Sequence, residues 1–374
     1  MDSFTLLHLS LIPDIGPQAV KKILELVIPK NLNLYDLSVS DYRVYGIDEQ
    51  TAQKIVFGLH NKKAFDKEYA LLEKTGVKWT TVADADYPHL LLNTYAPPPV
   101  IYWQGDPVWL SESPTLAVVG SRDASLYGQR IIDHVVVPCI KQGMTIISGG
   151  ARGIDTLAHQ AALKNGGKTV VLLGSGLLKP YLVTHKSLFE QVVYVGGAVV
   201  SCFPLEAEAL PWRFPVRNRL IAGMAQGCFV VQAAQESGAL ITAKYALEEG
   251  RSVYTVPGLF DDPLSAGCHA LLKEGAQLVT DPYDILQDYG FARQVVDLAP
   301  VKKEKQSYVQ KVVPFVEKSD GSKNSLEILC ARPISLYDLV EQTGKDESEL
   351  KMELFELQIA GKVEQDFAGL WFTV

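Results

Sequence analysis

The chain has 374 residues, of which 47% are hydrophobic and 21% charged, and its formal net charge at pH 7 is −8. This length predicts two or three folded domains, and this composition excludes long disordered stretches. The net negative charge excludes a protein that coats nucleic acid through its overall charge, so any DNA binding must be local.

The ends and the cysteines give the first exclusions. The N-terminal Met-Asp-Ser-Phe has no basic region before its apolar stretch, and no apolar run reaches about 18 residues, so we expect a cytoplasmic protein without membrane contact. The five cysteines contain no C-x-x-C pair, which favours buried, reduced thiols over a metal or redox site.

Residues 1–66 predict an all-α N-terminal domain. Two similar segments, 12–23 and 45–55, each carry a glycine at a turn and then residues at helical spacing, which resembles a helix-hairpin-helix (SAM-like) element. Such a hairpin can present backbone N–H groups to a phosphate. A small helical packing module fits equally well, because Asp14, Asp48 and Glu49 near the turns would repel DNA.

Residues 67–110 predict an extended connector, because the run Ala96-Pro-Pro-Pro disfavours helix. Residues 111–290 then alternate short β-branched runs with helical stretches, and continuous apolar runs are typical of strands covered on both faces. The fold class is therefore α/β, with a Rossmann-like, doubly wound, mostly parallel sheet. The predicted strands are Thr115–Val119, Met144–Ile147, Thr169–Leu173, Ala198–Ser201, Cys228–Gln232, Ser252–Val256 and Gln277–Val279.

Residues 291–322 are charged and rich in turn formers, which predicts a linker. Residues 323–374 predict three helices and two short strands, the order of a small C-terminal winged-helix domain. Its candidate recognition helix, 346–359, carries five acidic residues against Lys351 and would repel phosphate. We therefore favour a protein contact or an autoregulatory role for this tail over binding of duplex DNA.

Familiar enzyme signatures are incomplete. The turn after the first core strand, Gly120-Ser-Arg-Asp, lacks the second glycine of a dinucleotide fingerprint, and Ala162 replaces the first glycine of a phosphate-binding loop before Gly167-Lys-Thr. No nucleophile elbow and no H-E-x-x-H are present. His159 is expected to be structural. We therefore expect no catalytic residues, no metal and no cofactor.

Glycine-rich turns follow three of the predicted strands, at the edge where an open α/β sheet binds its ligand. They are Gly120-Ser121-Arg122, Ser148-Gly-Gly150-Ala-Arg152-Gly-Ile-Asp155, and Gly174-Ser-Gly176. Close backbone approach and two arginines on one rim suit an anion with several phosphates. Purely structural turns would also explain the glycines.

A second candidate is the loop from Pro211 to Arg219. No Asp or Glu occurs from Ala209 to Gln235, while Arg213, Arg217 and Arg219 accompany Trp212 and Phe214. Aromatic rings stack on unpaired bases while arginine contacts phosphate, which is how single strands are bound without sequence reading. The alternative is that the two aromatic residues are core anchors.

Together these motifs resemble the DprA/Smf family. The matching segments lie at 148–159, 214–223, 237–243, 249–258 and 267–276, and the resemblance spans about residues 84–286. It implies a non-catalytic recombination mediator that binds single-stranded DNA in a basic pocket. It also implies a homodimer built through the Rossmann-like domain, and loading of RecA onto incoming, protected DNA during natural transformation.

By motif match, Arg122 would contact phosphate, Phe214 would stack on or support a base, and Arg217 with Arg219 would line the pocket. Arg219 could equally form a structural ion pair. The family often has lysine at the position of Pro211 and just after a Tyr-Pro pair, where this chain has Leu182-Val183; Arg213, Lys179 and Lys186 are candidate substitutes. The expected DNA-binding residues are Gly120, Ser121, Arg122, Gly150, Arg152, Gly174, Gly176, Lys179, Arg213, Phe214, Arg217, Asn218 and Arg219.

An alternative function is a nucleotide-processing enzyme resembling the phosphoribohydrolases, which use the same rim of turns. Their typical P-G-G-x-G-T-x-x-E signature is missing from this chain, which weighs against the alternative.

Overall fold

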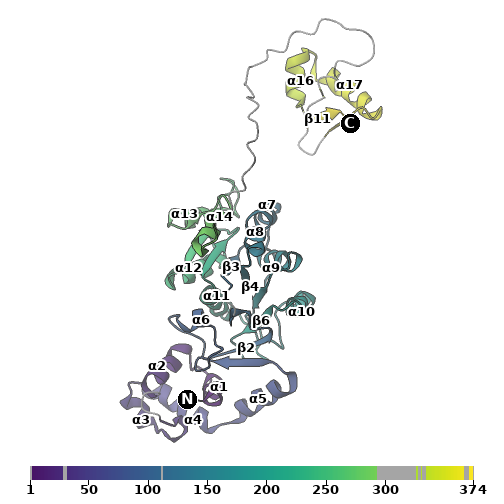
Figure 1. Cartoon of the computed structure of the whole chain (residues 1–374). Helices are drawn as coiled ribbons and strands as arrows, with labels where there is room; N and C mark the ends of the chain where they lie inside the picture. The colour runs from purple at the N-terminus through teal and green to yellow at the C-terminus, as the bar shows by residue number, and fades with distance from the viewer. Residues whose placement is uncertain are drawn as a thin grey trace. The chain divides into compact units, whose positions relative to one another are not determined.

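The computed structural model describes residues 2–27, 32–110, 113–292, 326, 330, 334–365 and 370–373 (Figure 1). The chain divides into two compact units, Met1–Val295 and Val296–Val374, and each is described by itself.

The first unit begins with a helical module. Its apolar faces meet around Leu6, Ile23, Tyr42 and Ile55, all of them buried. Asp2, Ser38 and Asp48 cap three helices by accepting a backbone N–H in the first turn. The last helix crosses the boundary expected after residue 66. The helices are α1 (Ser3–Ser10), α2 (Pro17–Val27), η2 (Leu34–Asp36), α3 (Val39–Val44), α4 (Glu49–His60) and α5 (Lys63–Thr75).

In this module, a lysine from each of the two similar segments contacts the glycine turn of the other segment. The Lys54 ammonium lies 2.9 Å from the Asp14 carboxylate, and the Lys22 ammonium donates to the Gly46 carbonyl. Each segment therefore uses its cation on the turn of the other. This pattern favours the packing module over a phosphate-binding hairpin.

A nine-stranded sheet forms the centre of this unit, in the order β1-β2-β6-β5-β4-β3-β7-β8-β9. The run from β6 to β9 is parallel and contains every predicted core strand, so the doubly wound, mostly parallel sheet is confirmed. β1 and β2 extend it antiparallel, within the predicted connector. The strands are β1 (Lys78–Thr81), β2 (Val100–Gly105), β3 (Thr115–Val119), β4 (Thr145–Gly149), β5 (Thr169–Leu172), β6 (Ala198–Ser201), β7 (Gly227–Val230), β8 (Ser252–Thr255) and β9 (Gln277–Leu278).

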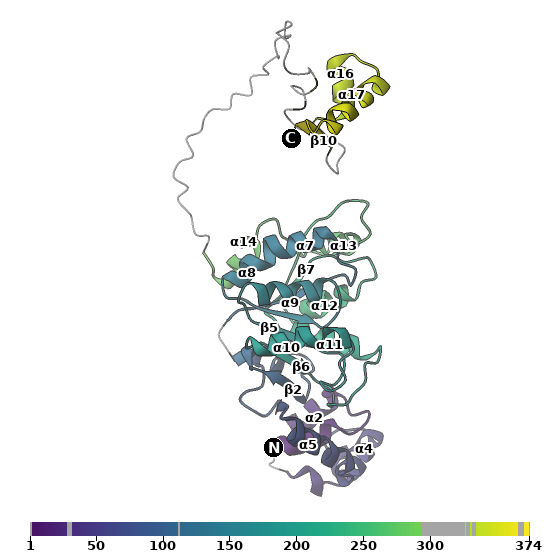
Figure 2. The same ribbon diagram turned by 90° about the vertical axis from the view of Figure 1, so that its right-hand side faces the viewer.

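Helices cover both faces of the sheet (Figures 1 and 2). In β3, Leu116 and Val118 join the core under α7, α8, α9 and α14, whereas Ala117 and Val119 join the core under α11, α12 and α13. Alternate residues thus enter opposite cores, which explains the continuous apolar runs. The helices are α6 (His89–Leu92), α7 (Leu126–Ile131), α8 (Val137–Lys141), α9 (Ile154–Lys164), α10 (Lys186–Tyr194), α11 (Arg213–Met224), α12 (Gly238–Glu248), α13 (Ala266–Lys273) and α14 (Tyr283–Leu286).

The second unit contains α16 (Leu336–Thr343), α17 (Glu347–Ile359) and the antiparallel pair β10 (Val363–Gln365) and β11 (Trp371–Thr373). Leu339, Leu354 and Trp371 are buried in its core. The predicted linker, apart from residues 291 and 292, and most of the first predicted helix of the tail lie outside the described residues.

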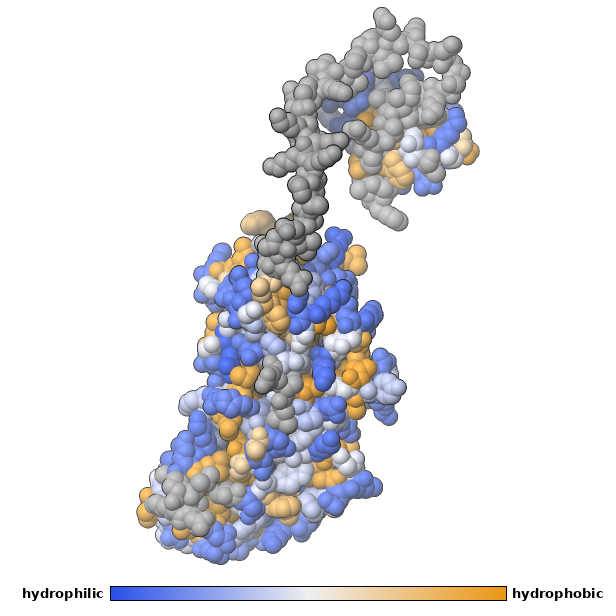
Figure 3. Space-filling view, in the orientation of Figure 1, coloured by the Kyte–Doolittle hydropathy of each residue, from blue (hydrophilic) through white to orange (hydrophobic). Residues whose placement is uncertain are grey.

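The described helices include none with the length and apolar character needed to cross a bilayer. On the face of the first unit seen in Figure 3, hydrophilic residues predominate and apolar ones are scattered among them.

Candidate functional site

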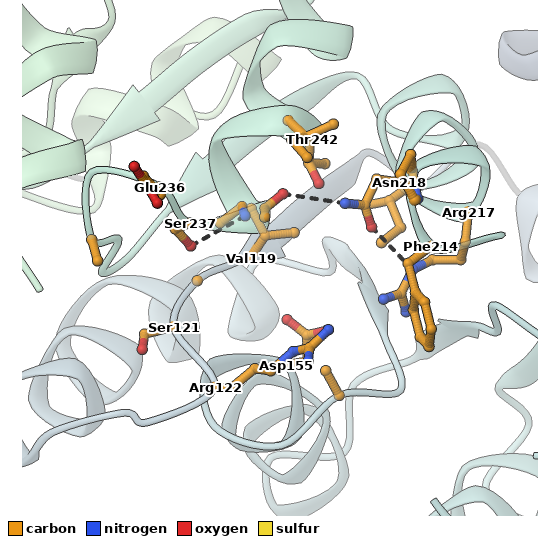
Figure 4. Close-up of a pocket in the computed structure, with 18 of the residues that line it drawn as sticks. Val119, Ser121, Arg122, Asp155, Phe214, Arg217, Asn218, Glu236, Ser237 and Thr242 are labelled. Atoms are coloured by element: carbon orange, nitrogen blue, oxygen red, sulfur yellow. Dashed lines mark hydrogen bonds between the residues drawn. The ribbon is translucent and has the colours of Figure 1, made fainter. Parts of the chain in front are cut away.

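A cavity of about 540 Å³ opens at the carboxyl edge of the sheet, between β3 and β7. The chain leaves β3 toward α7 on one face and leaves β7 toward α12 on the other, so this is the point where the winding of the sheet reverses. Open α/β sheets bind ligands at this position. Figure 4 shows the residues of α11 facing the turn after β3 across the cavity.

Hydrogen bonds join the turn after β3 to the segments that follow β7 and β4. Ser121 donates its N–H to the Gln232 carbonyl at 2.8 Å, and its own carbonyl accepts from the Ile154 N–H at 3.1 Å. Gly153 has φ +77°, and a Cβ there would lie 2.2 Å from the Ser121 carbonyl oxygen. Only glycine fits this contact. The backbone beneath Arg122 is therefore fixed.

Arg122 is exposed at the rim of the cavity. Within the described ranges its guanidinium makes no hydrogen bond or ion pair; its close neighbour is the Phe214 ring, whose centroid lies 5.8 Å from the guanidinium carbon. The acidic Glu236 lies at the opposite end of the cavity from Phe214 (Figure 4). The Asp155 carboxyl in the same cavity attracts Arg122 electrostatically but forms no ion pair with it, so the rim at Arg122 carries a positive charge that is not ion-paired among the described residues.

Arg217 forms the floor of the cavity and is only 6% exposed. It donates to the Leu172 carbonyl at 2.9 Å and to Asn218 Oδ1 at 3.1 Å, and Asn218 donates onward to the Gly238 carbonyl. These contacts tie α11 to β5 and α12. Arg217 therefore supports the site from below.

The buried carboxyl of Asp155 faces Arg217. Burial raises the pKa of Asp155 to about 6, against the attraction of the Arg217 guanidinium. A Cβ on Gly149 would lie 2.1 Å from Arg217 Nη1 and 2.5 Å from Asp155 Oδ2. The absence of a side chain at residue 149 therefore admits this pair. The sequence predicts no role for Asp155, because its partner Arg217 lies far along the chain.

Phe214 stands half-exposed between the two arginines, because the Arg217 guanidinium carbon is also 5.8 Å from its ring centroid. Tyr181 packs edge to face against it at 5.3 Å, and a Cβ on Gly174 would lie 3.1 Å from the ring. Tyr181 was not predicted because it lies in an irregular segment. The core-anchor alternative is wrong for Trp212, which is 58% exposed.

The structure divides the predicted residues into two sets. Those at the main cavity or at the small hollow beside it are Gly120, Ser121, Arg122, Gly150, Gly174, Phe214, Arg217 and Asn218. Gly176 serves packing, because a Cβ there would lie 2.1 Å from the Pro204 carbonyl oxygen. Arg152 is exposed, lines neither hollow and has no hydrogen bond or ion pair among the described residues.

The remaining predicted cations contact other parts of the chain. The Arg219 guanidinium carbon lies 4.5 Å from the centroid of the Tyr245 ring, and its Nη2 lies 3.7 Å from the Glu248 carboxylate. Arg219 therefore forms an ion pair, which was one of the two roles considered for it. Lys179 lies 3.7 Å from Glu208. Arg213 contacts the rings of both Phe203 and Trp212.

His159 has a structural role, as expected. Its ring nitrogens lie 2.7 Å from the Thr169 hydroxyl and 2.9 Å from the Gly149 carbonyl, and burial lowers its pKa to about 4. The cysteines are unpaired, and four of them are buried. In the part of the chain that the structure describes, no cluster of His, Cys, Asp and Glu side chains could hold a metal ion.

Comparison with known proteins identifies the family. Residues 78–290 match the family described as DNA recombination-mediator protein A. The chain is 37% identical to Protein Smf of Escherichia coli over 302 residues, covering 80% of this chain and 78% of that protein. It is 39% identical to DNA processing protein DprA of Streptococcus pneumoniae over 245 residues, covering 63% and 85%.

Solved structures agree with these relatives. The X-ray structure of DNA processing protein A from Streptococcus pneumoniae matches with a TM-score of 0.65 at 34% identity, covering 78% of this chain and 99% of that chain. DNA processing protein A from Helicobacter pylori, whose structure is described for its single-stranded DNA binding mode, shares the fold with a TM-score of 0.51 at 23% identity, covering 57% and 95%. The family description names a recombination mediator, in agreement with the expectation of a non-catalytic protein. This chain belongs to the DNA recombination-mediator protein A (DprA/Smf) family.

Proposed function

We propose that the chain binds single-stranded DNA at the carboxyl edge of its sheet, with a phosphate at Arg122 and a base at Phe214. The observation that carries this proposal is an exposed arginine without an ionic partner, on a fixed turn, beside a half-exposed aromatic ring. Base stacking on aromatic side chains with arginine at the phosphates is the usual way to bind single strands. The relative from Helicobacter pylori binds single-stranded DNA, which supports the same ligand here.

Because the chain has a net negative charge, DNA binding must depend on a local positively charged patch. Single strands suit the site better than duplex, because a paired base cannot lie on Phe214 without leaving its stack. Arg217 and Asp155 would act by positioning, since both are buried.

The test compares oligodeoxythymidine affinity of the native chain with that of Phe214→Ala and Phe214→Tyr. Loss of a stacking contact predicts a roughly tenfold weaker affinity for Phe214→Ala and near-native affinity for Phe214→Tyr. The native chain should also bind a single strand more tightly than a duplex of the same sequence. Equal affinity of all three proteins would contradict the proposed site.

The finer steps of the function rest on the family resemblance: a homodimer through the Rossmann-like domain that loads RecA onto the bound strand. Sedimentation of the full chain tests the dimer. The rate of RecA assembly on single-stranded DNA, with and without the chain, tests the loading. No acceleration by a chain that binds DNA normally would exclude the RecA step alone.

For the tail we propose a winged-helix domain that contacts protein. α17 exposes Met352, Phe355 and Ile359 among acidic residues, a surface that disfavours phosphate. Truncation after residue 322 should therefore leave oligonucleotide affinity unchanged. A large loss of affinity would show that the tail takes part in DNA binding.

A further inference from the structure

Trp212 is a large aromatic side chain at the surface that the proposed site does not use. It is 58% exposed and immediately precedes α11, two residues before Phe214. Its neighbour Phe203 follows β6, whereas Phe214 contacts Gly174, which follows β5. β5 and β6 are adjacent and parallel. Two aromatic positions thus stand over neighbouring strands, whose spacing is about 4.8 Å, at the same edge of the sheet.

The Trp212 ring is held in place by its neighbours. Phe203 meets it edge to face, with centroids 6.1 Å apart and planes at 86°. The Arg213 guanidinium carbon lies 4.9 Å from the Trp212 centroid and 5.1 Å from that of Phe203, and Arg213 also donates to the Glu208 carbonyl. An exposed ring that is already oriented loses little freedom when a ligand stacks on it.

The cations linked to this ring already have partners. Arg213 is held as described, and Lys179 lies 3.7 Å from Glu208, the residue whose carbonyl accepts from Arg213. The feature of this part of the edge that remains available to a ligand is therefore the aromatic ring. It complements a flat, uncharged group with a π-face, and every nucleobase provides one.

We propose that Trp212 is a second base-stacking position, which takes an unpaired base of the same strand that occupies Phe214. The strand then runs along the carboxyl edge of the sheet, from Arg122 near β3 past Phe214 at β5 to Trp212 at β6. This inference rests on the proposed function. Because the contact is stacking, it adds affinity without adding a phosphate contact, so it leaves the salt dependence of binding unchanged.

The experiment measures the affinity of the full-length chain for oligodeoxythymidines of increasing length, at several salt concentrations, for the native protein, Trp212→Ala and Trp212→Phe. We expect Trp212→Ala to lose about tenfold in affinity for the longer oligomers, with an unchanged slope of log affinity against log salt. The shortest oligomers should lose little, and Trp212→Phe should stay close to native. Far-UV circular dichroism and urea midpoints control for folding.

The outcomes separate the two proposals. A native chain that binds none of the oligomers overturns both. Native binding with unchanged affinity of Trp212→Ala at every length overturns the second position alone. A reduced salt slope in Trp212→Ala also overturns it, because the contact would then be ionic.

Discussion

The chain has two sets of glycine turns with nearby cations, one in the helical module and one at the carboxyl edge of the sheet. The cations of the two sets have different roles. In the module, Lys22 and Lys54 each bind the opposite turn. At the sheet edge, Arg122 projects from a locked turn and has no ionic partner within the described residues. A glycine turn with a cation indicates an anion site only where the fold leaves the cation unpaired.

The same contrast divides the arginines of α11. Arg217 and Arg219 are two residues apart, so they project from different sides of the helix. Arg217 is buried against Asp155 and bonded to a sheet carbonyl, whereas Arg219 pairs with Glu248 near the surface. The motif match placed both in one pocket and left a structural ion pair open for Arg219; the structure gives each arginine a separate role.

The largest expected effect tests that division. Arg217→Ala leaves the Asp155 carboxyl buried without its countercharge and the Leu172 carbonyl without its donor, so the free energy of unfolding should fall by about 3 kcal/mol or more. Arg219→Ala is the matched control on the same helix and should cost about 1 kcal/mol or less. Urea denaturation measures both. Similar losses for the two variants would contradict the assignment of Arg217 to the floor.

The locked turn gives the next effect. Gly153→Ala brings a Cβ within 2.2 Å of the Ser121 carbonyl oxygen and should cost about 3 kcal/mol, with weaker oligonucleotide binding because the turn under Arg122 shifts. Gly166→Ala is the control: it has a similar φ, +68°, and open space around it, so it should cost about 1 kcal/mol and leave binding intact. Equal costs would show that the contact between the turns is not tight.

The buried carboxyl predicts a pH dependence. Asp155 in the folded chain has its pKa raised to about 6, above the value of about 3.9 in an unfolded chain. Its contribution to stability is therefore fully present below about pH 4 and is lost as the pH rises through about 6. Relative to Asp155→Asn, which keeps the shape and cannot ionise, the native chain should lose about 2 kcal/mol across that window. A constant difference between the two proteins from pH 4 to pH 7 would show that this pKa is not raised.

The sequence predicts the sheet well and the site only in part. Buried apolar runs identified the strands from β3 to β8, because their residues alternate between apolar cores on the two faces of the sheet. The prediction at Gln277–Val279 also matches β9, although both residues of that short strand are exposed. β1 escaped prediction because Lys78-Trp-Thr-Thr is a short, partly polar edge strand. Arg122 and Phe214 were found from their residue types and their neighbours. Asp155 and Tyr181 were missed, since their roles depend on contacts across the fold with residues distant in sequence.

The most direct test of the central claim compares the unpaired cation with a paired one. Arg122→Ala should weaken binding to oligodeoxythymidine about tenfold and reduce the salt slope by about 1, because one phosphate contact is removed. Lys22→Ala, which removes a cation of the helical module, should change neither quantity. Equal effects of the two substitutions, or an unchanged slope in Arg122→Ala, would contradict the assignment of DNA binding to the carboxyl edge of the sheet.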